Sequence, residues 1–522
     1  MPVAAGVAGL VAALVACWLL LVPQGGQPDE HSHIVRSAAL VRGAHSAPDV
    51  KDGYVLPDRY VVADPGCYAF QPTISARCVI LPEASGGEVI LVTRADDYPW
   101  GGHLLFGVAG LLPGLAPVWW GRLAAAAIGT ARIAAALVFA WRSRSLSVGA
   151  LLLGLTPMAW AIIPAVNPSS MVTAGGAALW VGLLLAGRHT SSTTGMTAGH
   201  RWLIALAWAA TVLPRRDGMV WACLIAVVAL LLTGSDLVGL GRRLGAGPVA
   251  TIAASTAAVI LWGFTSDARA SSLVVLAPLV VVLVEGVRHW WARSRPDSVV
   301  IAWIAGLAVL VGVVAWVALI STRPDGWDTD LVVTVIGQTD ENIIEAIGVL
   351  GWLDTRIPNL AVFAWLVLLG MLVAGAAVAN RRGLVAAGAV ALIAAVTAWT
   401  FELLQGDDSG TYWQGRYSLP LLVGVPLLIA WRPADPPTVP RSSPVMELPR
   451  FGTVAAVGGL VLLNVAAWSA ARRWGVGTTG SYLPWRWDTA VQPFPVLVLL
   501  VVHAAATIAL GWVLLRPTAD PG

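Results

Sequence analysis

Two carboxylates and two imidazoles follow the first hydrophobic segment, in the stretch Pro28–Asp29–Glu30–His31–Ser32–His33. Proline suits the first turn of a helix and acidic residues suit its positive end, so a helix is predicted to begin here and to stop at Gly43. On that helix His33 shares a face with Asp29 and Glu30, which precede it by four and three residues. A carboxylate held or tuned by a neighbouring histidine can act as a general base that takes a proton from a hydroxyl group.

The same spacing admits two other interpretations. Carboxylates at a helix N-terminus are often ordinary dipole-stabilising groups without a chemical role. Asp29, Glu30 and His33 would also supply three ligands for a divalent metal ion, but the sequence identifies no fourth ligand. Catalysis, capping and metal binding therefore all remain open from these residues alone.

Polar and aromatic residues recur in short boxes beside other hydrophobic segments, at 98–103, 167–170, 214–218, 351–358 and 414–420. An arginine fork pairs with phosphate and aromatic faces stack on sugar rings, so such boxes could bind a sugar phosphate. The candidate binding residues are His103, Asn167, Arg216, Trp352, Asp354, Arg356, Gln414, Arg416 and Tyr417. The alternative is structural, because Trp and Tyr anchor helices at the membrane surface and Asn-Pro forms tight turns.

Membrane helices must position these boxes. Hydrophobic residues make up 57% of the 522 residues and charged residues only 12%, and the apolar runs approach the ~20 residues needed to cross a bilayer. The predicted spans are 3–23, 120–141, 146–166, 169–187, the short pair 202–213 and 219–233, then 247–264, 270–287, 299–320, 359–379, 384–404, 417–431, 451–470 and 493–515. The broken run 104–118 is predicted to be an interfacial or re-entrant helix. We therefore expect an all-α polytopic membrane protein, with fourteen segments if the short pair counts as two.

Basic residues orient these segments. Arginines concentrate in every second loop, and by the positive-inside rule those loops and both termini are expected on the cytoplasmic side. Most Asp and Glu residues fall in the opposite loops, of which 24–119, 321–358 and 471–492 are long. The polar boxes lie on this extracytoplasmic side, so the chemistry is expected there.

The four cysteines divide into two pairs. Cys67 and Cys78 share the first outer loop, which faces an oxidising compartment, so a disulfide between them is predicted. Cys17 and Cys223 lie inside predicted spans and are expected to be packing residues.

Four of these boxes occur in an order that resembles a known family: Pro28-Asp29-Glu30-x-x-His33, Asn167-Pro168, Gly351-Trp352-Leu353-Asp354-Thr355 with Pro358, and Gln414-Gly415-Arg416-Tyr417 with Pro420. The family is an uncharacterised group of bacterial multipass membrane proteins, filed as a domain of unknown function and distantly similar to the GT-C glycosyltransferases. The resemblance covers about residues 5–430, and it implies a GT-C-like bundle of about 12–14 transmembrane segments with a large first extracytoplasmic loop. Residues 1–430 would form this core, and residues 431–522 a C-terminal pair of helices with a Trp- and Arg-rich outer loop.

The resemblance implies an inverting transferase that takes a sugar from a polyprenyl-phosphate carrier at the outer face of a bacterial plasma membrane. Asp29 or Glu30 would deprotonate a cell-envelope acceptor, with His33 as partner. The carrier phosphate would be held by arginines, with Arg216, Arg356 and Arg416 as candidates in rising order of preference. No nucleotide-binding motif and no nucleic-acid-binding feature is present in the sequence, and no cofactor is assigned beyond the metal ion considered above.

Two other functions fit a polytopic envelope protein. A transporter or flippase of envelope glycolipids would need polar residues along a path across the membrane, whereas only Arg132 and His503 lie near the middle of a predicted span. A non-catalytic scaffold of an envelope-polymer complex would tolerate loss of both carboxylates.

Overall fold

The computed structural model describes residues 2–80, 83–143, 146–187, 195–265, 277–286, 329–405, 412–432, 448–487 and 492–516. The predicted span 299–320 lies outside these residues, as do parts of the predicted span 270–287 and of the outer segment 321–358.

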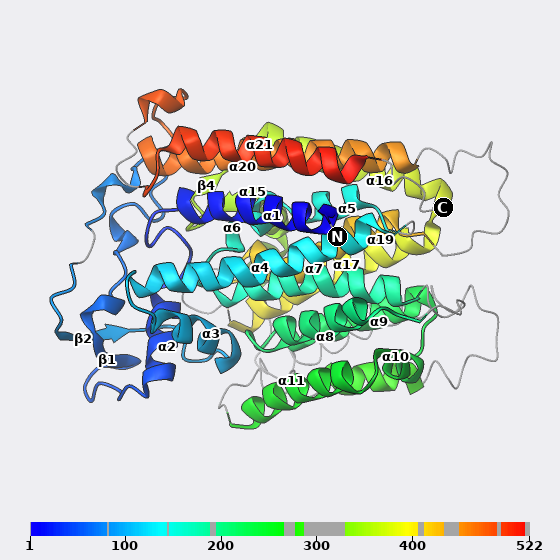
Figure 1. Cartoon of the computed structure of the whole chain (residues 1–522), viewed down its shortest axis with the longest axis horizontal. Helices are drawn as coiled ribbons and strands as arrows, with labels where there is room; N and C mark the ends of the chain where they lie inside the picture. Colours follow the sequence, from blue (N-terminus) through cyan, green and yellow to red (C-terminus); the bar gives the residue numbers. More distant parts are fainter. Residues whose placement is uncertain are drawn as a thin grey trace.

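Long helices that run side by side form the body of the protein (Figure 1). The helices of the N-terminal half are α1 (Pro2–Leu21), α2 (Glu30–Arg42), α3 (Trp100–Gly110), α4 (Pro117–Trp141), α5 (Val148–Gly154), α6 (Pro157–Ile162), α7 (Pro168–Ala186), α8 (Ala198–Val212), α9 (Gly218–Thr233), α10 (Leu237–Leu244) and α11 (Ala246–Thr265). Those of the C-terminal half are α14 (Thr329–Gly337), α15 (Thr339–Gly348), α16 (Asn359–Ala379), α17 (Arg381–Gln405), α18 (Leu419–Leu422), α19 (Gly424–Ala430), α20 (Leu448–Val476) and α21 (Val496–Leu515). Two small antiparallel hairpins join β1 (Gly53–Pro57) to β2 (Glu88–Val92), and β3 (Val349–Leu350) to β4 (Thr355–Arg356).

Helix α7 is the centre of the bundle, and every residue in it is buried. Small residues allow this, because side chains of neighbouring helices would otherwise keep the backbones apart. A Cβ atom on Gly176 would lie 2.8 Å from the carbonyl oxygen of Pro420, so α18 can approach α7 only at a glycine. Trp180 then donates from its indole nitrogen to the same carbonyl at 3.2 Å. The close approach brings the 414–420 box next to α7.

Among the described residues, eight helices are long and apolar enough to cross a membrane, or up to nine if α9 and α10 count as one bent span. They are α1, α4, α7, α11, α16, α17, α20 and α21. These eight agree with predicted spans, and the all-α polytopic fold is confirmed. The run 104–118 holds the end of the short helix α3 and the first two residues of α4, and forms no membrane-length helix of its own.

The remaining predicted spans within the described residues are shorter or broken. The prediction of one continuous helix over 146–166 is wrong: the chain breaks between α5 and α6, where the Thr156 side chain caps α6 and Pro157 occupies its first turn. The predicted span 417–431 is likewise divided into α18 and α19. The short pair is confirmed as two separate helices, α8 and α9, and α9 meets α10 at a bend of 102°.

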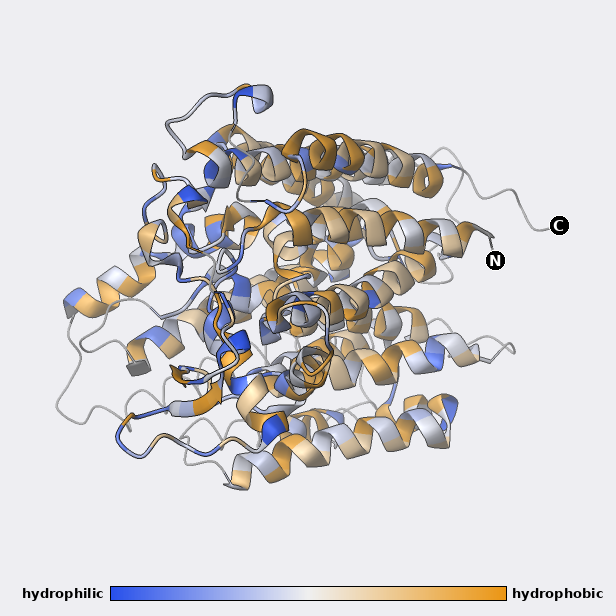
Figure 2. Cartoon of the chain, turned by 60° about the vertical axis from the view of Figure 1, so that its left-hand side comes forward, coloured by the Kyte–Doolittle hydropathy of each residue, from blue (hydrophilic) through white to orange (hydrophobic). Residues whose placement is uncertain are grey.

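The first outer loop covers one end of the bundle. There α2 runs across the direction of the long helices, next to α3 and the β1–β2 hairpin (Figure 1). Hydrophobic residues dominate the long helices, whereas hydrophilic segments gather toward this end (Figure 2). The first turn of α1 and the last turn of α21 lie at the opposite end of the bundle (Figure 1). The hydrophilic segments therefore gather at the end away from these two turns.

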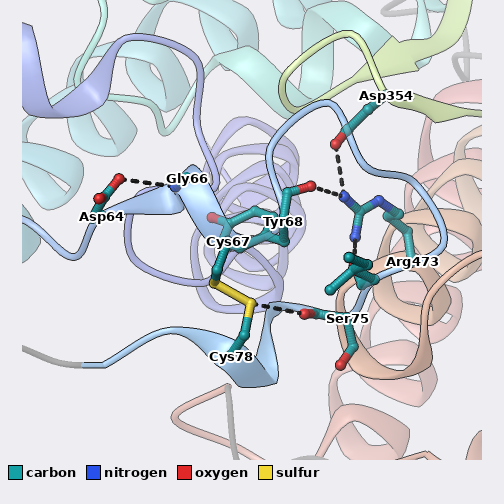
Figure 3. The surroundings of a disulfide bond; sticks show 9 residues. Asp64, Gly66, Cys67, Tyr68, Ser75, Cys78, Asp354 and Arg473 are labelled. Carbon is teal, nitrogen blue, oxygen red and sulfur yellow. Dashed lines mark hydrogen bonds and ion pairs between the residues drawn. A yellow bond between two sulfur atoms is a disulfide. The ribbon is translucent and has the colours of Figure 1, made fainter.

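A disulfide closes part of this loop. Cys67 and Cys78 are joined, as the sequence predicts, while Cys17 and Cys223 are free and buried. Arg473 from α20 donates to the carbonyl oxygens of Tyr68 and Ile74 on the closed segment (Figure 3). The disulfide loop is therefore fastened to the C-terminal part of the bundle.

Candidate functional site

The connection between α1 and α2 places the acidic box at the N-terminus of α7. The side-chain amide of Gln27 donates to the carbonyl oxygen of Ala161 at 3.1 Å, and that of Asn167 donates to the carbonyl oxygen of Pro28 at 3.1 Å. Asn167 also caps α7, since its Oδ1 accepts from the Ser169 backbone N–H at 2.9 Å. Asn167, predicted as a binding residue, thus positions the acidic box and the end of α7 relative to each other.

Glu30 makes a fully buried ion pair with Arg122 of α4. Its two carboxylate oxygens accept from Nε and Nη2 of Arg122, both at 2.7 Å, and the two side chains are 0% and 1% exposed. The Gly25 backbone N–H also donates to Glu30 at 3.2 Å. Arg122 further donates to the carbonyl oxygens of Val22 and Pro23 just beyond α1. Both charges of this pair are therefore satisfied inside the bundle.

Asp29 has the opposite surroundings. Its backbone lies in the left-handed region, with φ 58° and ψ 13°, and its side chain makes no capping hydrogen bond to α2. The carboxylate is 45% exposed and accepts from Nη2 of Arg416 at 2.9 Å, whereas the Arg416 side chain is only 1% exposed. The remaining donors of Arg416, Nε and Nη1, are buried without a hydrogen-bond partner in the described part of the chain. A half-exposed carboxylate thus covers an incompletely paired guanidinium.

Two carboxylates hold the segment that carries Arg416. Glu345 accepts from the Gly415 backbone N–H at 2.7 Å, and Glu402 accepts from the Trp413 backbone N–H. A Cβ atom at Gly415 would lie 2.2 Å from the carbonyl oxygen of Asn342, so only glycine allows this approach to α15. These contacts fix Arg416 from two sides.

A second arginine joins the site, but it is Arg215 rather than the predicted Arg216. Arg215 pairs with Asp217 through two contacts of 2.8 and 3.0 Å, and its Nη1 donates to the Ser169 hydroxyl at 2.9 Å. Its guanidinium lies 4.4 Å from the ring centre of Tyr417, a predicted binding residue. Arg216 is only partly buried and makes no ion pair with any residue that the structure describes.

His33 contacts His103 instead of the carboxylates. The Nδ1 of His33 lies 3.1 Å from the Nε2 of His103, and the Tyr98 ring stands edge-on to His33 at 5.3 Å. The left-handed backbone at Asp29 breaks the predicted spacing between Asp29 and His33, whereas Glu30 keeps its place on α2 and is engaged by Arg122 instead. Burial, with the nearby charges of His103 and Arg215, holds the pKa of His33 well below its ordinary value.

The same burial affects the neighbours of His33. It lowers the pKa of His103 to about 4 and raises the pKa of Tyr98 to about 12. At neutral pH these three groups are therefore uncharged, and the arginines are the cations closest to Asp29 in the described structure.

The 351–358 box has a mainly structural environment. Asp354 pairs with Arg473 at 2.7 Å, and both side chains are almost fully buried (Figure 3). Arg356 pairs with Glu341 at the surface, and among the described residues it has no ion pair with Asp29 and no contact with Arg416. Trp352 donates from its indole nitrogen to the carbonyl oxygen of Gly25 at 2.8 Å. Of this box only Trp352 touches the segment that carries Asp29.

Gln414 and the proposed metal site complete the predicted set. Gln414 precedes Arg416, and its Oε1 is buried without a partner in the described residues. Asp29, Glu30 and His33 point to three different partners, and the described ranges contain no group of three or more His, Cys, Asp or Glu residues that could hold a metal ion. The metal ligands proposed from spacing therefore do not converge here.

Sequence reasoning missed several members of this site. Tyr98 stood in a recognised box, but its burial against His33 comes from the fold of the first outer loop. Glu345 and Glu402 gave no signal, because they accept from backbone N–H groups of the Arg416 segment, 70 and 11 residues away in sequence. Arg215 could have been proposed from its place in the turn 214–218. The sequence alone, however, does not show which of the two adjacent arginines points into the protein.

The assembled groups can bind an anion and move a proton. Arg416 and Arg215 present cationic donors, and Asp29 is an accessible carboxylate. The Tyr417 ring is close to both guanidinium groups, 4.4 Å from that of Arg215 and 5.2 Å from that of Arg416. Burial strengthens charge interactions because the local dielectric is low.

Residues 13–267 match the model of a family described as "Predicted membrane protein (DUF2142)". Similar solved structures include ArnT from Cupriavidus metallidurans bound to undecaprenyl phosphate, at 14% identity and a TM-score of 0.40 over 97% of this chain and 76% of that chain. The apo structure of ArnT from the same organism gives 15% identity and a TM-score of 0.37 over 97% and 75% of the two chains. No curated protein matches the chain. The resemblance to a membrane family of unknown function is confirmed over residues 13–267, which are similar to the DUF2142 predicted membrane proteins.

Proposed function

We propose that this membrane protein is a glycosyltransferase that transfers a sugar from a polyprenyl-phosphate-linked donor to a cell-envelope acceptor. The observation that carries the proposal is the contact between Asp29 and Arg416, which joins an accessible carboxylate to a buried, incompletely paired guanidinium. The site would face the extracytoplasmic side of a bacterial plasma membrane, with both termini on the cytoplasmic side.

Arg416 is the proposed contact for the carrier phosphate. A buried polar group without a partner costs about 1–3 kcal/mol, and more when it is charged, so its free Nε and Nη1 donors favour an anionic ligand. Phosphate accepts two parallel hydrogen bonds from a guanidinium. Arg215 adds positive charge nearby, although its own donors are partly occupied by Asp217 and Ser169.

Asp29 is the proposed general base. Its carboxylate pairs with the guanidinium that a phosphate would bind, so donor binding would compete with Asp29 for Arg416. The released carboxylate would take the proton of the acceptor hydroxyl as that oxygen attacks the anomeric carbon. The bond from this carbon to the phosphate oxygen breaks, polyprenyl phosphate leaves with the electron pair, and the sugar is transferred with inversion.

Glu30 is the less suitable base, although the sequence ranked the two carboxylates equally. Both of its oxygens are engaged by Arg122 and its side chain is fully buried, so no acceptor hydroxyl can reach it without breaking the ion pair. His33 does not contact either carboxylate. Its proposed role is to place an uncharged side chain, together with His103, near Arg416.

The test is sugar transfer by purified protein in proteoliposomes, with labelled polyprenyl-phosphate sugars as donors and envelope extract as acceptor. Asp29→Asn should lower the rate on the order of 10²–10⁴-fold, the usual contribution of a general base. Asp49→Asn is the matched control, because Asp49 is an exposed carboxylate in the same outer loop. Full activity of Asp29→Asn would remove the base, and movement of labelled lipid across the bilayer without transfer would favour a transporter.

A further inference from the structure

A cavity of about 390 Å³ lies beside the acidic box, between α2 and the disulfide loop. Its walls include His31, Tyr60, Val62, Asp64, Phe70 and Trp352. The volume falls within the ~300–1,000 Å³ typical of small-molecule sites, which combine a mainly apolar lining with a few polar groups. None of the residues proposed above to bind phosphate or to accept a proton lines this cavity.

Aromatic rings form one side of the cavity. The indole of Trp352 stacks on the His31 ring at 6.0 Å with 29° between the planes, and Phe70 stands edge-on to Trp352 at 5.7 Å. Phe70 is 67% exposed and has φ 60°, a left-handed backbone conformation that is unfavourable for a bulky residue. The fold thus holds a large apolar ring toward solvent in a strained conformation, a feature that clusters at ligand sites.

Polar groups on the other side are free to bind hydroxyls. The Nδ1 of His31 is buried without a hydrogen-bond partner in the described residues. Burial lowers the pKa of His31, so its imidazole is neutral at pH 7 and each ring nitrogen can serve as donor or acceptor. Asp64 is exposed, and its Oδ1 accepts only the local Gly66 N–H at 2.8 Å.

These features favour a sugar over a hydrocarbon chain as the ligand of this cavity. An alkyl chain would cover Asp64 and His31 without offering any hydrogen bond, and burial of unpaired polar groups is costly. A pyranose ring presents C–H groups to aromatic faces and hydroxyls to polar side chains. We propose that this cavity binds a sugar ring, and, resting on the proposed function, that the ring belongs to the acceptor.

The position of the cavity supports the acceptor assignment. His31 follows Asp29 by two residues, and Trp352 is hydrogen-bonded to Gly25 in the segment that leads to Asp29. A sugar held against Trp352 and His31 would therefore be anchored to the same short stretch of chain as the proposed base.

The experiment is saturation-transfer NMR on the full chain in lipid nanodiscs, with methyl glycosides of glucose, galactose, mannose and arabinose as probes. At least one glycoside should receive saturation on its ring C–H protons. Phe70→Gly removes the stacking ring and relieves the strained backbone, so it should fold well and weaken binding by about tenfold. Trp352→Leu should abolish the signal, and Ile80→Ala, at an exposed apolar position outside the cavity, should leave it unchanged.

The outcomes distinguish this inference from the proposed function. Absence of binding by all four glycosides, or binding that survives both Phe70→Gly and Trp352→Leu, overturns the sugar site. A co-purified lipid that is lost only in Trp352→Leu would assign the cavity to a hydrocarbon chain and also overturn it. Asp29→Asn should keep the NMR signal. The sugar site would therefore stand even if the proposed catalytic role of Asp29 were disproved.

Discussion

Asp29 and Glu30 are neighbours in the chain, and each contacts an arginine from a distant segment, but the two pairs differ in exposure and in saturation. Glu30 and Arg122 are both buried and use both carboxylate oxygens. Asp29 is 45% exposed and contacts Arg416 through a single hydrogen bond, while two donors of that arginine stay unpaired. The difference indicates that Glu30 stabilises the fold and that Asp29 is available to a ligand.

A third pair supports this distinction. Asp354 and Arg473 are as deeply buried as Glu30 and Arg122, and Arg473 also binds backbone carbonyls of the disulfide loop. Buried pairs thus fasten the outer loops to the bundle, with only the Nε of Arg473 left without a hydrogen-bond partner among the described residues of these two pairs. Among the three pairs, only Asp29 and Arg416 leave hydrogen-bonding capacity beside an accessible carboxylate.

The largest expected effect concerns stability. Glu30→Gln leaves Arg122 buried without its counter-charge, and removal of one partner of a buried pair costs about 3–5 kcal/mol. Thermal unfolding in detergent should therefore show a severe loss of stability, whereas Asp29→Asn should cost less, because Asp29 is half-exposed and an Asn oxygen can still accept from Arg416. The comparison breaks if Glu30→Gln is as stable as wild type and loses sugar transfer, because Glu30 would then be the reactive carboxylate.

The next effect concerns anion binding. Arg416→Lys keeps the charge but loses the planar fork, so affinity for polyprenyl phosphate should fall about 10–100-fold, as expected when hydrogen bonds to a charged group are lost. Binding can be measured by ligand titration of protein in nanodiscs. Arg356→Lys is the matched control, because Arg356 pairs only at the surface. Equal losses in both variants would contradict the selective role of Arg416.

A smaller effect should appear on acidification. The pKa of His103 is lowered to about 4 in the folded protein, so the unfolded chain takes up a proton first as the pH falls below about 6.5. Folding stability is therefore full above that pH and decreases toward pH 4, by on the order of 2 kcal/mol at pH 5 for this group. His103→Gln should flatten the pH dependence of thermal stability between about pH 7.5 and 5. An unchanged pH dependence of thermal stability in this variant would show that His103 is not held uncharged near Arg416 by its burial.

The smallest effect is expected at the surface pair of Arg356 and Glu341. Exposed ion pairs contribute about 0–1 kcal/mol, so Arg356→Ala should leave both stability and sugar transfer close to wild type. A large loss of transfer in this variant would return Arg356 to the phosphate site that the sequence suggested.

Sequence patterns predicted the elements better than the side-chain directions. Hydrophobic length and the boxes predicted the long spans, the disulfide and the approach of Arg416 to the acidic box. The choice between Arg215 and Arg216 depends on which residue of a turn points inward, and the packing of Tyr417 and Ser169 decides it.

The roles of Asp29 and Glu30 were undecided for a related reason. A regular helix from Asp29 would have placed both carboxylates beside His33, but the left-handed backbone directs Asp29 away and Arg122 engages Glu30. The residues before Asp29 are held by long-range hydrogen bonds to α6 and to the start of α7, through Gln27 and Asn167. Local spacing therefore could not reveal which carboxylate meets Arg122 and which meets Arg416.

The contact between Asp29 and Arg416 spans 387 positions of the chain. During synthesis the carboxylate leaves the ribosome long before its arginine, and a nascent chain that ends near residue 267 holds the acidic box without Arg416. The site can therefore be completed only after Arg416 has been synthesised, and a product truncated before that residue would lack the cation that contacts Asp29.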